Sequence, residues 1–113
     1  MNEFIYLFRS GASSNNSMSP EQMQAQMARW QSWMGKLAEE GKLHSPGAPL
    51  HPTGKVVATN GAVTDGPFTE GKEIIGGYMI VKAKDIHDAA AISKGCPIFE
   101  AGGTVEIREI APM

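Results

Sequence analysis

The segment Phe4-Ile5-Tyr6-Leu7-Phe8, written FIYLF, decides the fold of this chain. In an extended conformation, side chains alternate between two faces, so Phe4, Tyr6 and Phe8 point to one side and Ile5 and Leu7 to the other. Charged residues bound the segment at both ends. Because both faces are apolar, we predict that the segment is a central strand of a sheet.

A long amphipathic helix is predicted next. Ser19 is a typical N-cap, Pro20 suits the first turn, where its missing N–H is harmless, and Gln22 can complete a capping box. Apolar residues then recur at steps of four and three and form one stripe, which comprises Met23, Met27, Trp30, Met34 and Leu37. Gly41 is expected to end the helix. Trp33 lies about 80° from the centre of the stripe, so we expect it at the edge of the buried face, where it can touch a neighbour or a ligand.

The middle of the chain is rich in turn residues. Residues 42–52 contain three prolines and a glycine, so any strand there must be short or lie at a sheet edge. Asn60-Gly61 separates Lys55–Thr59 from Ala62–Thr64. Because Asn-Gly tolerates the two positive φ angles of a type I′ turn, we predict a hairpin with that turn.

Three more elements complete the pattern. Ile74–Ala83 is predicted as a long strand, and its Gly-Gly pair indicates a bulge or a close approach of another backbone. Asp85 is expected to cap a helix over Ile86–Lys94 that ends at Gly95. Thr104–Ile110 alternates between apolar and charged residues, as a half-buried strand does.

This order of elements predicts an α+β fold of the ferredoxin-like βαββαβ type, with an antiparallel sheet and two helices on one face. The second face of the sheet then carries Ile5, Leu7 and part of Ile74–Ala83, with no further helix to cover it. We therefore expect a homodimer that packs sheet to sheet.

Composition limits the class of protein. The 113 residues suit one domain, 1–113, and the shares of 42% hydrophobic and 19% charged residues are those of a soluble globular protein. The formal net charge of −2, without a basic patch, gives no reason to expect nucleic acid or a membrane as partner. The N-terminal residues do not resemble a secretory signal, and Cys96 is the only cysteine, so we expect a cytoplasmic protein without a disulfide.

The stretch VTDGPFTEGKE, Val63 to Glu73, is the best candidate for a functional site. It is longer than a turn requires, and it presents the carboxylate of Asp65, the aromatic ring of Phe68 and the cation of Lys72 between two strands. Such loops are suited to binding. Asp65 can equally form an Asx-turn with its own backbone, and Lys72 with Glu73 can be a solvated pair.

Known catalytic and metal-binding motifs are missing from the sequence. His44, His51 and Asp65 come from segments of unknown proximity, so we expect neither a metal nor another cofactor. No basic residue near Cys96 would lower the pKa of its thiol, and we expect Cys96 to be a buried packing residue.

Several runs together resemble the YCII-related proteins of the DGPF type. The resemblance extends over almost the whole chain, and the matching runs occur in the expected order: FIYLFR, SPEQMQAQMARWQSWMGKLAEEGKL, PTGKVV, VTDGPFTEGKEIIGGYMIVKAKD, GCPIFE and GGTVEIREI. The resemblance implies a dimeric α+β barrel whose clefts, in the wider superfamily, host cofactor-independent isomerases, lyases and monooxygenases. Related proteins of this kind use a His–Asp pair for acid–base chemistry.

Only Asp65, within the DGPF motif, is carried over from this resemblance as a site acid. Members of the DGPF type often show a Gly-Glu-Pro-Leu-like run, whereas this chain has Gly47-Ala48-Pro49-Leu50, so an alanine stands where a carboxylate is expected. His44 is a plausible partner base, since histidine titrates near neutral pH, although a lone loop histidine is often merely exposed.

Three interpretations follow. In the first, Asp65 shuttles a proton on a small metabolite, Arg9 or Lys72 holds an anionic group, and Phe68 and Trp33 form an apolar wall. Arg9 can equally be a solvated strand end. In the second, the protein is a dimeric binding or regulatory module without catalysis, like the accessory units that accompany bacterial transcription factors. In the third, the motif is structural and shapes the hairpin and the Gly-Gly bulge.

Overall fold

The FIYLF segment lies in an inner strand of a four-stranded antiparallel sheet, as predicted. The computed structural model describes residues 1–11, 19–51, 53–66 and 73–112. Along the chain the elements are β1 (Asn2–Gly11), α1 (Pro20–Glu39), β2 (Leu43–Pro49), β3 (Gly54–Val57), β4 (Val63–Gly66), β5 (Glu73–Ala83), α2 (Ile86–Ser93), the short 3-10 helix η1 (Pro97–Ala101) and β6 (Thr104–Glu109).

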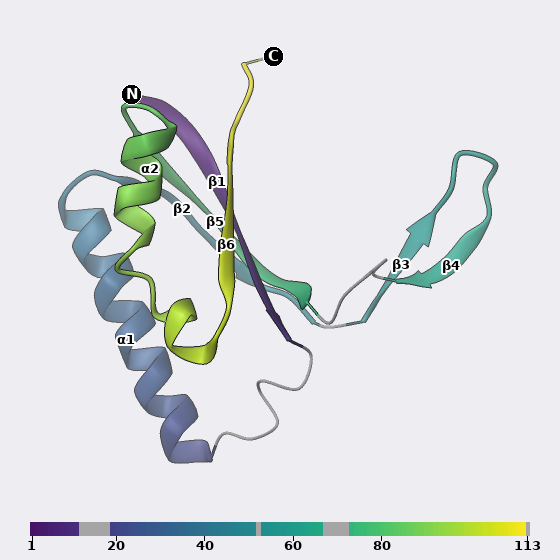
Figure 1. Cartoon of the computed structure of the whole chain (residues 1–113), viewed down its shortest axis with the longest axis horizontal. Helices are drawn as coiled ribbons and strands as arrows, with labels where there is room; N and C mark the ends of the chain where they lie inside the picture. The colour runs from purple at the N-terminus through teal and green to yellow at the C-terminus, as the bar shows by residue number, and fades with distance from the viewer. Residues whose placement is uncertain (12–18, 52, 67–72, 113) are drawn as a thin grey trace.

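The strand order in the sheet is β2-β5-β1-β6, and every neighbouring pair is antiparallel. Both helices cover the same face of this sheet (Figure 1). This arrangement is the ferredoxin-like α+β fold, so the predicted fold is confirmed. β3 and β4 form a separate two-stranded sheet that projects from the rest of the molecule (Figure 1). We call this hairpin, residues 54–66, the arm.

The core lies between the sheet and the helices. Phe4, Tyr6 and Phe8 are buried there, as the alternation in FIYLF predicts, whereas Ile5 and Leu7 on the other face are only partly buried. The remaining buried apolar residues come from α1, β5, α2 and the start of η1: Leu37, Met79, Val81, Ala83, Ala89 and Cys96.

The predicted start of α1 is confirmed in detail. The hydroxyl of Ser19 accepts a hydrogen bond from the Gln22 N–H, and the Gln22 side chain accepts one from the Ser19 N–H. These two bonds satisfy N–H groups that the first turn of a helix leaves without partners. The helix ends before Gly41, whose φ of 73° is one that glycine adopts readily.

The prediction that the whole apolar stripe of α1 is buried is wrong for its first half. Trp30, Met34 and Leu37 pack on the core, but Met23 and Met27 are 50% and 61% exposed. A helix of 20 residues is about 30 Å long. Its N-terminal half therefore extends past the end of the sheet, as Figure 1 shows, and this leaves the two methionine side chains exposed.

The Gly-Gly pair of β5 creates the predicted bulge. Gly77 is opposite Phe8, but the next pair joins Arg9 to Ile75, so Gly76 is an extra residue on β5. A close backbone approach occurs on β2, where a Cβ on Gly47 would lie 1.8 Å from the carbonyl oxygen of Tyr78. Only glycine fits at Gly47.

The hairpin is confirmed, but the predicted type I′ turn is wrong. Asn60 does not adopt the positive φ that this turn requires; only Gly61 does, at 88°. The Gly61 N–H donates to the Ala58 carbonyl, and the Ala58 N–H donates to the Ala62 carbonyl. These bonds define a three-residue loop with a bulge at Gly61. The Asn60 side chain stabilises it by accepting a hydrogen bond from the Ala62 N–H.

Candidate functional site

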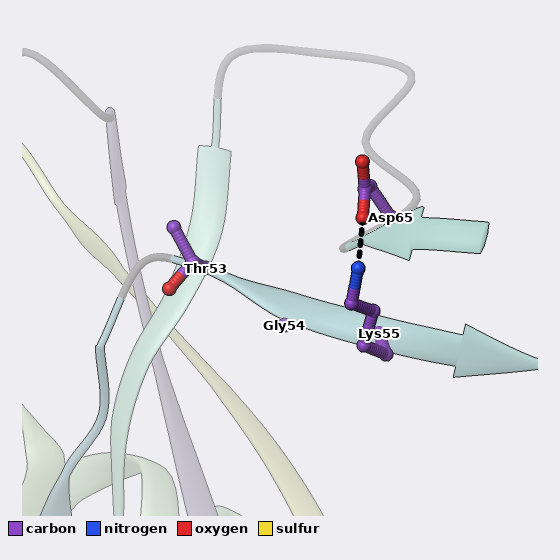
Figure 2. Close-up of a pocket in the computed structure, with 4 residues that line it drawn as sticks. All are labelled: Thr53, Gly54, Lys55 and Asp65. Atoms are coloured by element: carbon purple, nitrogen blue, oxygen red, sulfur yellow. Dashed lines mark hydrogen bonds and ion pairs between the residues drawn. The ribbon is translucent and has the colours of Figure 1, made fainter. Parts of the chain in front are cut away.

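The candidate site lies at the base of the arm, where the DGPF motif begins. The register of β3 and β4 places Lys55 directly opposite Asp65. The Nζ atom of Lys55 donates to Oδ1 of Asp65, and the two side chains point toward each other from neighbouring strands (Figure 2). The sequence suggested a loop position or an Asx-turn for Asp65; instead it lies within β4, and its carboxylate bonds a lysine side chain.

A hollow of about 450 Å³ adjoins this ion pair. The described residues that line it are Thr53, Gly54, Lys55 and Asp65 (Figure 2). Among the described residues, no atom would lie within 4 Å of a Cβ on Gly54, so this part of the chain leaves the space beside the backbone open. Both charged side chains are accessible from the solvent, since 66% of Lys55 and 88% of Asp65 is exposed.

The pair combines two functions that a small polar ligand needs. The Lys55 ammonium can hold an anionic oxygen, and the Asp65 carboxylate can accept a hydrogen bond or a proton. In bulk water an exposed ion pair of this kind contributes less than about 1 kcal/mol to stability. The two charges are therefore available to a ligand at little cost to the fold.

His44, the predicted partner base, lies elsewhere. It is on the edge strand β2, and its Nε2 atom is 3.1 Å from Oε2 of Glu3 on β1. Both side chains are partly exposed, and His44 is not among the described residues that line the hollow. The structure thus pairs this histidine with a glutamate of the sheet and does not bring it to Asp65.

Arg9, a predicted anion-binding residue, is held by an ion pair within the sheet. Its Nη2 atom lies 3.1 Å from Oε1 of Glu106 on β6, and its Nε atom donates to the same oxygen over 3.2 Å. About a third of the side chain is exposed. Arg9 is therefore an anchored strand-end residue, and it too is absent from the described lining of the hollow.

Trp33 lies at the edge of the buried face, as predicted, and is half-buried. Its ring stacks on Tyr6 with a centroid distance of 6.5 Å and meets Trp30 edge to face at 5.9 Å. Phe8 extends this aromatic cluster through Trp30. Trp33 thus belongs to the layer between α1 and the sheet, not to the described wall of the hollow.

Two further predicted site residues, Phe68 and Lys72, lie outside the residues that the structure describes. They follow Asp65 within the same motif, and their role stays a prediction.

Lys55 belongs to the candidate site, although the sequence pattern did not single it out. A two-residue turn at Asn60-Gly61 would pair Lys55 with Gly66, whereas the three-residue loop pairs it with Asp65. Asparagine followed by glycine is compatible with both loops. The signal was therefore present in the hairpin itself, and a shift of one residue in the assumed register concealed it.

Two buried titratable groups, Tyr6 and Cys96, are not among the described residues that line the hollow. Burial raises the pKa of Tyr6, whose hydroxyl donates to the Ala89 carbonyl of α2. Burial also raises the pKa of the Cys96 thiol to about 12. Both groups therefore stay protonated at neutral pH, and the prediction that Cys96 is a buried packing residue is confirmed.

Within the described part of the chain, no three side chains of the His, Cys, Asp and Glu types come together as metal ligands would. No helix there combines the length and the apolar character needed to cross a bilayer.

Comparison with known proteins places the chain in a family. The model of the YCII-related domain matches residues 6–113. A search of curated protein sequences finds no match. Among solved structures, the chain is similar to 5-chloro-2-hydroxyhydroquinone dehydrochlorinase from Burkholderia phenoliruptrix AC1100 in complex with 2,5-dihydroxybenzoquinone. The TM-score is 0.54 with 16% sequence identity, and the match covers 98% of this chain and 94% of that chain, so the two share a fold.

Proposed function

The chain belongs to the YCII-related domain family, and from this premise we propose that it is a small cytoplasmic acid–base enzyme of the isomerase or lyase type, working without a cofactor. The observation that carries this proposal is the Lys55–Asp65 ion pair beside an open hollow. It supplies a proton acceptor and an anion-binding cation on adjacent strands, within a motif characteristic of the DGPF type.

The substrate class we propose is a small oxygenated ring, such as a hydroxylated quinone. The volume of the hollow, about 450 Å³, lies in the range of about 300–1,000 Å³ that is usual for small-molecule sites. The structurally similar dehydrochlorinase is solved with 2,5-dihydroxybenzoquinone, a compound of this class. Acidic ring hydroxyls of such compounds ionise easily, and the resulting anion suits the Lys55 ammonium.

The chemistry follows from the two charges. Asp65 would take a proton from the substrate, and the electron pair left behind would move toward a ring oxygen whose negative charge Lys55 stabilises. Efficient proton transfer requires that the bound substrate, or another part of the protein, excludes water from the site.

A non-enzymatic binding or regulatory module is the second candidate function. The high exposure of Asp65 favours it, because an exposed carboxylate can recognise a ligand without the basicity that catalysis needs. The location of His44 favours it too, since this histidine pairs with Glu3 on the sheet.

We further propose that the protein acts as a homodimer packed sheet to sheet. The face opposite the helices carries Ile5, Leu7, Tyr78 and Ile80, all only partly buried in the single chain. Two copies related by a two-fold axis would bury this apolar face against itself.

The deciding experiment compares Asp65→Asn, Lys55→Gln and the unaltered protein in binding and turnover of 2,5-dihydroxybenzoquinone and chlorinated hydroxyhydroquinones. Calorimetry measures binding, and absorbance measures turnover. We expect Asp65→Asn to lower turnover at least a hundredfold, and Lys55→Gln to weaken binding about tenfold. Glu100→Gln, which breaks the comparably exposed Arg29–Glu100 pair, is the matched control and should change neither.

The outcomes separate the candidates. Binding that depends on Lys55 and Asp65 without turnover supports the binding module. Loss of thermal stability in Asp65→Asn, with unchanged binding, would instead assign the motif a structural role.

A further inference from the structure

The arm is an unusual feature for an isolated chain. Its strands β3 and β4 pair with each other, and within the described residues they join no strand of the main sheet. A two-stranded hairpin without further cover is only marginally stable in water. The two strands of the arm nevertheless pair in regular register, with four cross-strand residue pairs from Gly54–Gly66 to Val57–Val63.

One face of the arm has an apolar and a charged half. Residues two apart on a strand share a face, so the Lys55–Asp65 and Val57–Val63 pairs lie side by side. The two valines are 67% and 59% exposed, although they are β-branched residues that usually pack against something. The ion pair of the candidate site is therefore next to an uncovered apolar patch.

The position of the arm suggests what covers this patch. The arm projects on the side of the sheet opposite α1 and α2, so that it and the open sheet face form the two sides of an angle (Figure 1). The radius of gyration is 15.4 Å, compared with roughly 13 Å for a compact domain of this length. The chain extends over 44 × 43 × 18 Å along its principal axes, which agrees with this spread-out shape.

We propose that the arm clasps a second copy of this chain, with Val57 and Val63 packed on the partner's surface. The proposal rests on the sheet-to-sheet dimer described above. A two-fold axis makes the contact reciprocal, so each copy extends one arm and receives the other.

The surface area that a specific interface buries favours a second copy of this chain as the partner of the arm. A specific interface buries about 800 Å² on each partner, far more than two valines provide. The partner that covers the valines must therefore also contact the neighbouring open face of the sheet. That face presents the same residues on every copy and pairs with itself under two-fold symmetry.

The clasp has a consequence for the site. Lys55 and Asp65 lie on the same face of the arm as the valines, so the docked copy becomes a wall of the hollow and excludes water from the ion pair. Exclusion of water strengthens the electrostatic attraction between the Lys55 ammonium and a bound anion. The active site is thereby composed of residues from two chains.

The test is a double variant, Val57→Ser with Val63→Ser, measured by sedimentation equilibrium over a range of concentrations. We expect the dissociation constant of the dimer to rise at least tenfold. The matched control, Met23→Gln with Met27→Gln, alters comparably exposed apolar residues on α1, and its dimer should dissociate as the unaltered one does. A double variant that dimerises normally overturns the clasp.

Hydrogen exchange provides a measurement without substitution. Amide protons of β3 and β4 should exchange faster when the protein is diluted below its dissociation constant, while those of β1 and β5 stay protected. Exchange in the arm that is independent of concentration overturns the proposal, and so does a protein that is monomeric throughout.

These results are distinct from a failure of the proposed function. If the arm variant dimerises normally but Asp65→Asn still abolishes turnover, only the clasp is wrong. If the arm variant dissociates while Asp65→Asn binds and turns over the quinones normally, only the proposed function is wrong.

Discussion

The four-stranded sheet and the arm are both antiparallel, yet they differ in what covers them. The sheet has two helices on one face and buries Phe4 and Tyr6 completely, whereas the valine pair of the arm is exposed. Burial of apolar side chains therefore stabilises the first unit within one chain. The arm depends on its turn, its cross-strand pairs and, in our proposal, a second copy. The same backbone pattern thus supports a rigid scaffold and, in our proposal, an interaction element.

The largest expected difference between the two units is in the effect of losing a side chain. Phe4→Ala should lower the free energy of unfolding by about 3–5 kcal/mol, because it leaves a cavity in the core. Val57→Ala on the exposed arm should change it by less than about 0.5 kcal/mol in the monomer. Urea denaturation below the dissociation constant of the proposed dimer measures both, and equal effects would contradict the division into scaffold and arm.

Glycine substitutions sharpen the comparison. Gly47→Ala places a methyl group against the Tyr78 carbonyl at a φ of 62°, and we expect a loss of about 2–4 kcal/mol from overpacking and backbone strain together. Gly61→Ala in the arm also has a positive φ, but a Cβ there meets no atom within 4 Å. It should cost only about 1 kcal/mol, the strain alone. Thermal unfolding of the two variants tests whether the close approach dominates.

Alkaline pH should affect the scaffold through Cys96. Burial raises the pKa of this thiol from 9.0 to about 12, so the folded state binds its proton more tightly than the unfolded state. The associated stability is fully present below about pH 9 and is lost as the pH rises toward 12, by at most about 1.4 kcal/mol per pH unit. Cys96→Ala should flatten this part of the profile. Tyr6, whose pKa is raised as well, adds a decline above pH 10 in both proteins.

Only a small effect on stability is expected at the ion pair of the arm. Lys55→Gln removes an exposed charge pair and should change the free energy of unfolding by less than about 1 kcal/mol. Urea denaturation of this variant, beside the binding measurement proposed above, separates a site residue from a structural one. A loss of several kcal/mol would show that the pair holds the arm together.

Much of the scaffold was predictable because its signals are local. The alternation in FIYLF, the capping box of Ser19 and Gln22, and the glycines of β5 each constrain their own segment. The exposure of Met27 was not predictable, because the periodicity of α1 says which residues share a face but not how far the sheet extends beneath them. The same distinction applies to the candidate site. Asp65 is recognisable within its motif, but its partner Lys55 depends on the loop that closes the hairpin.

Local sequence patterns were sufficient to predict the order of strands and helices, the faces they bury and the family motif that contains Asp65. These features depend on periodicities of two and 3.6 residues and on turn and cap residues within one segment. The folded chain was needed to show that Lys55 bonds Asp65, that His44 bonds Glu3 and that Trp33 stacks on Tyr6. Each of these contacts joins two different elements, and strand register and helix placement, which no local pattern specifies, bring their side chains together.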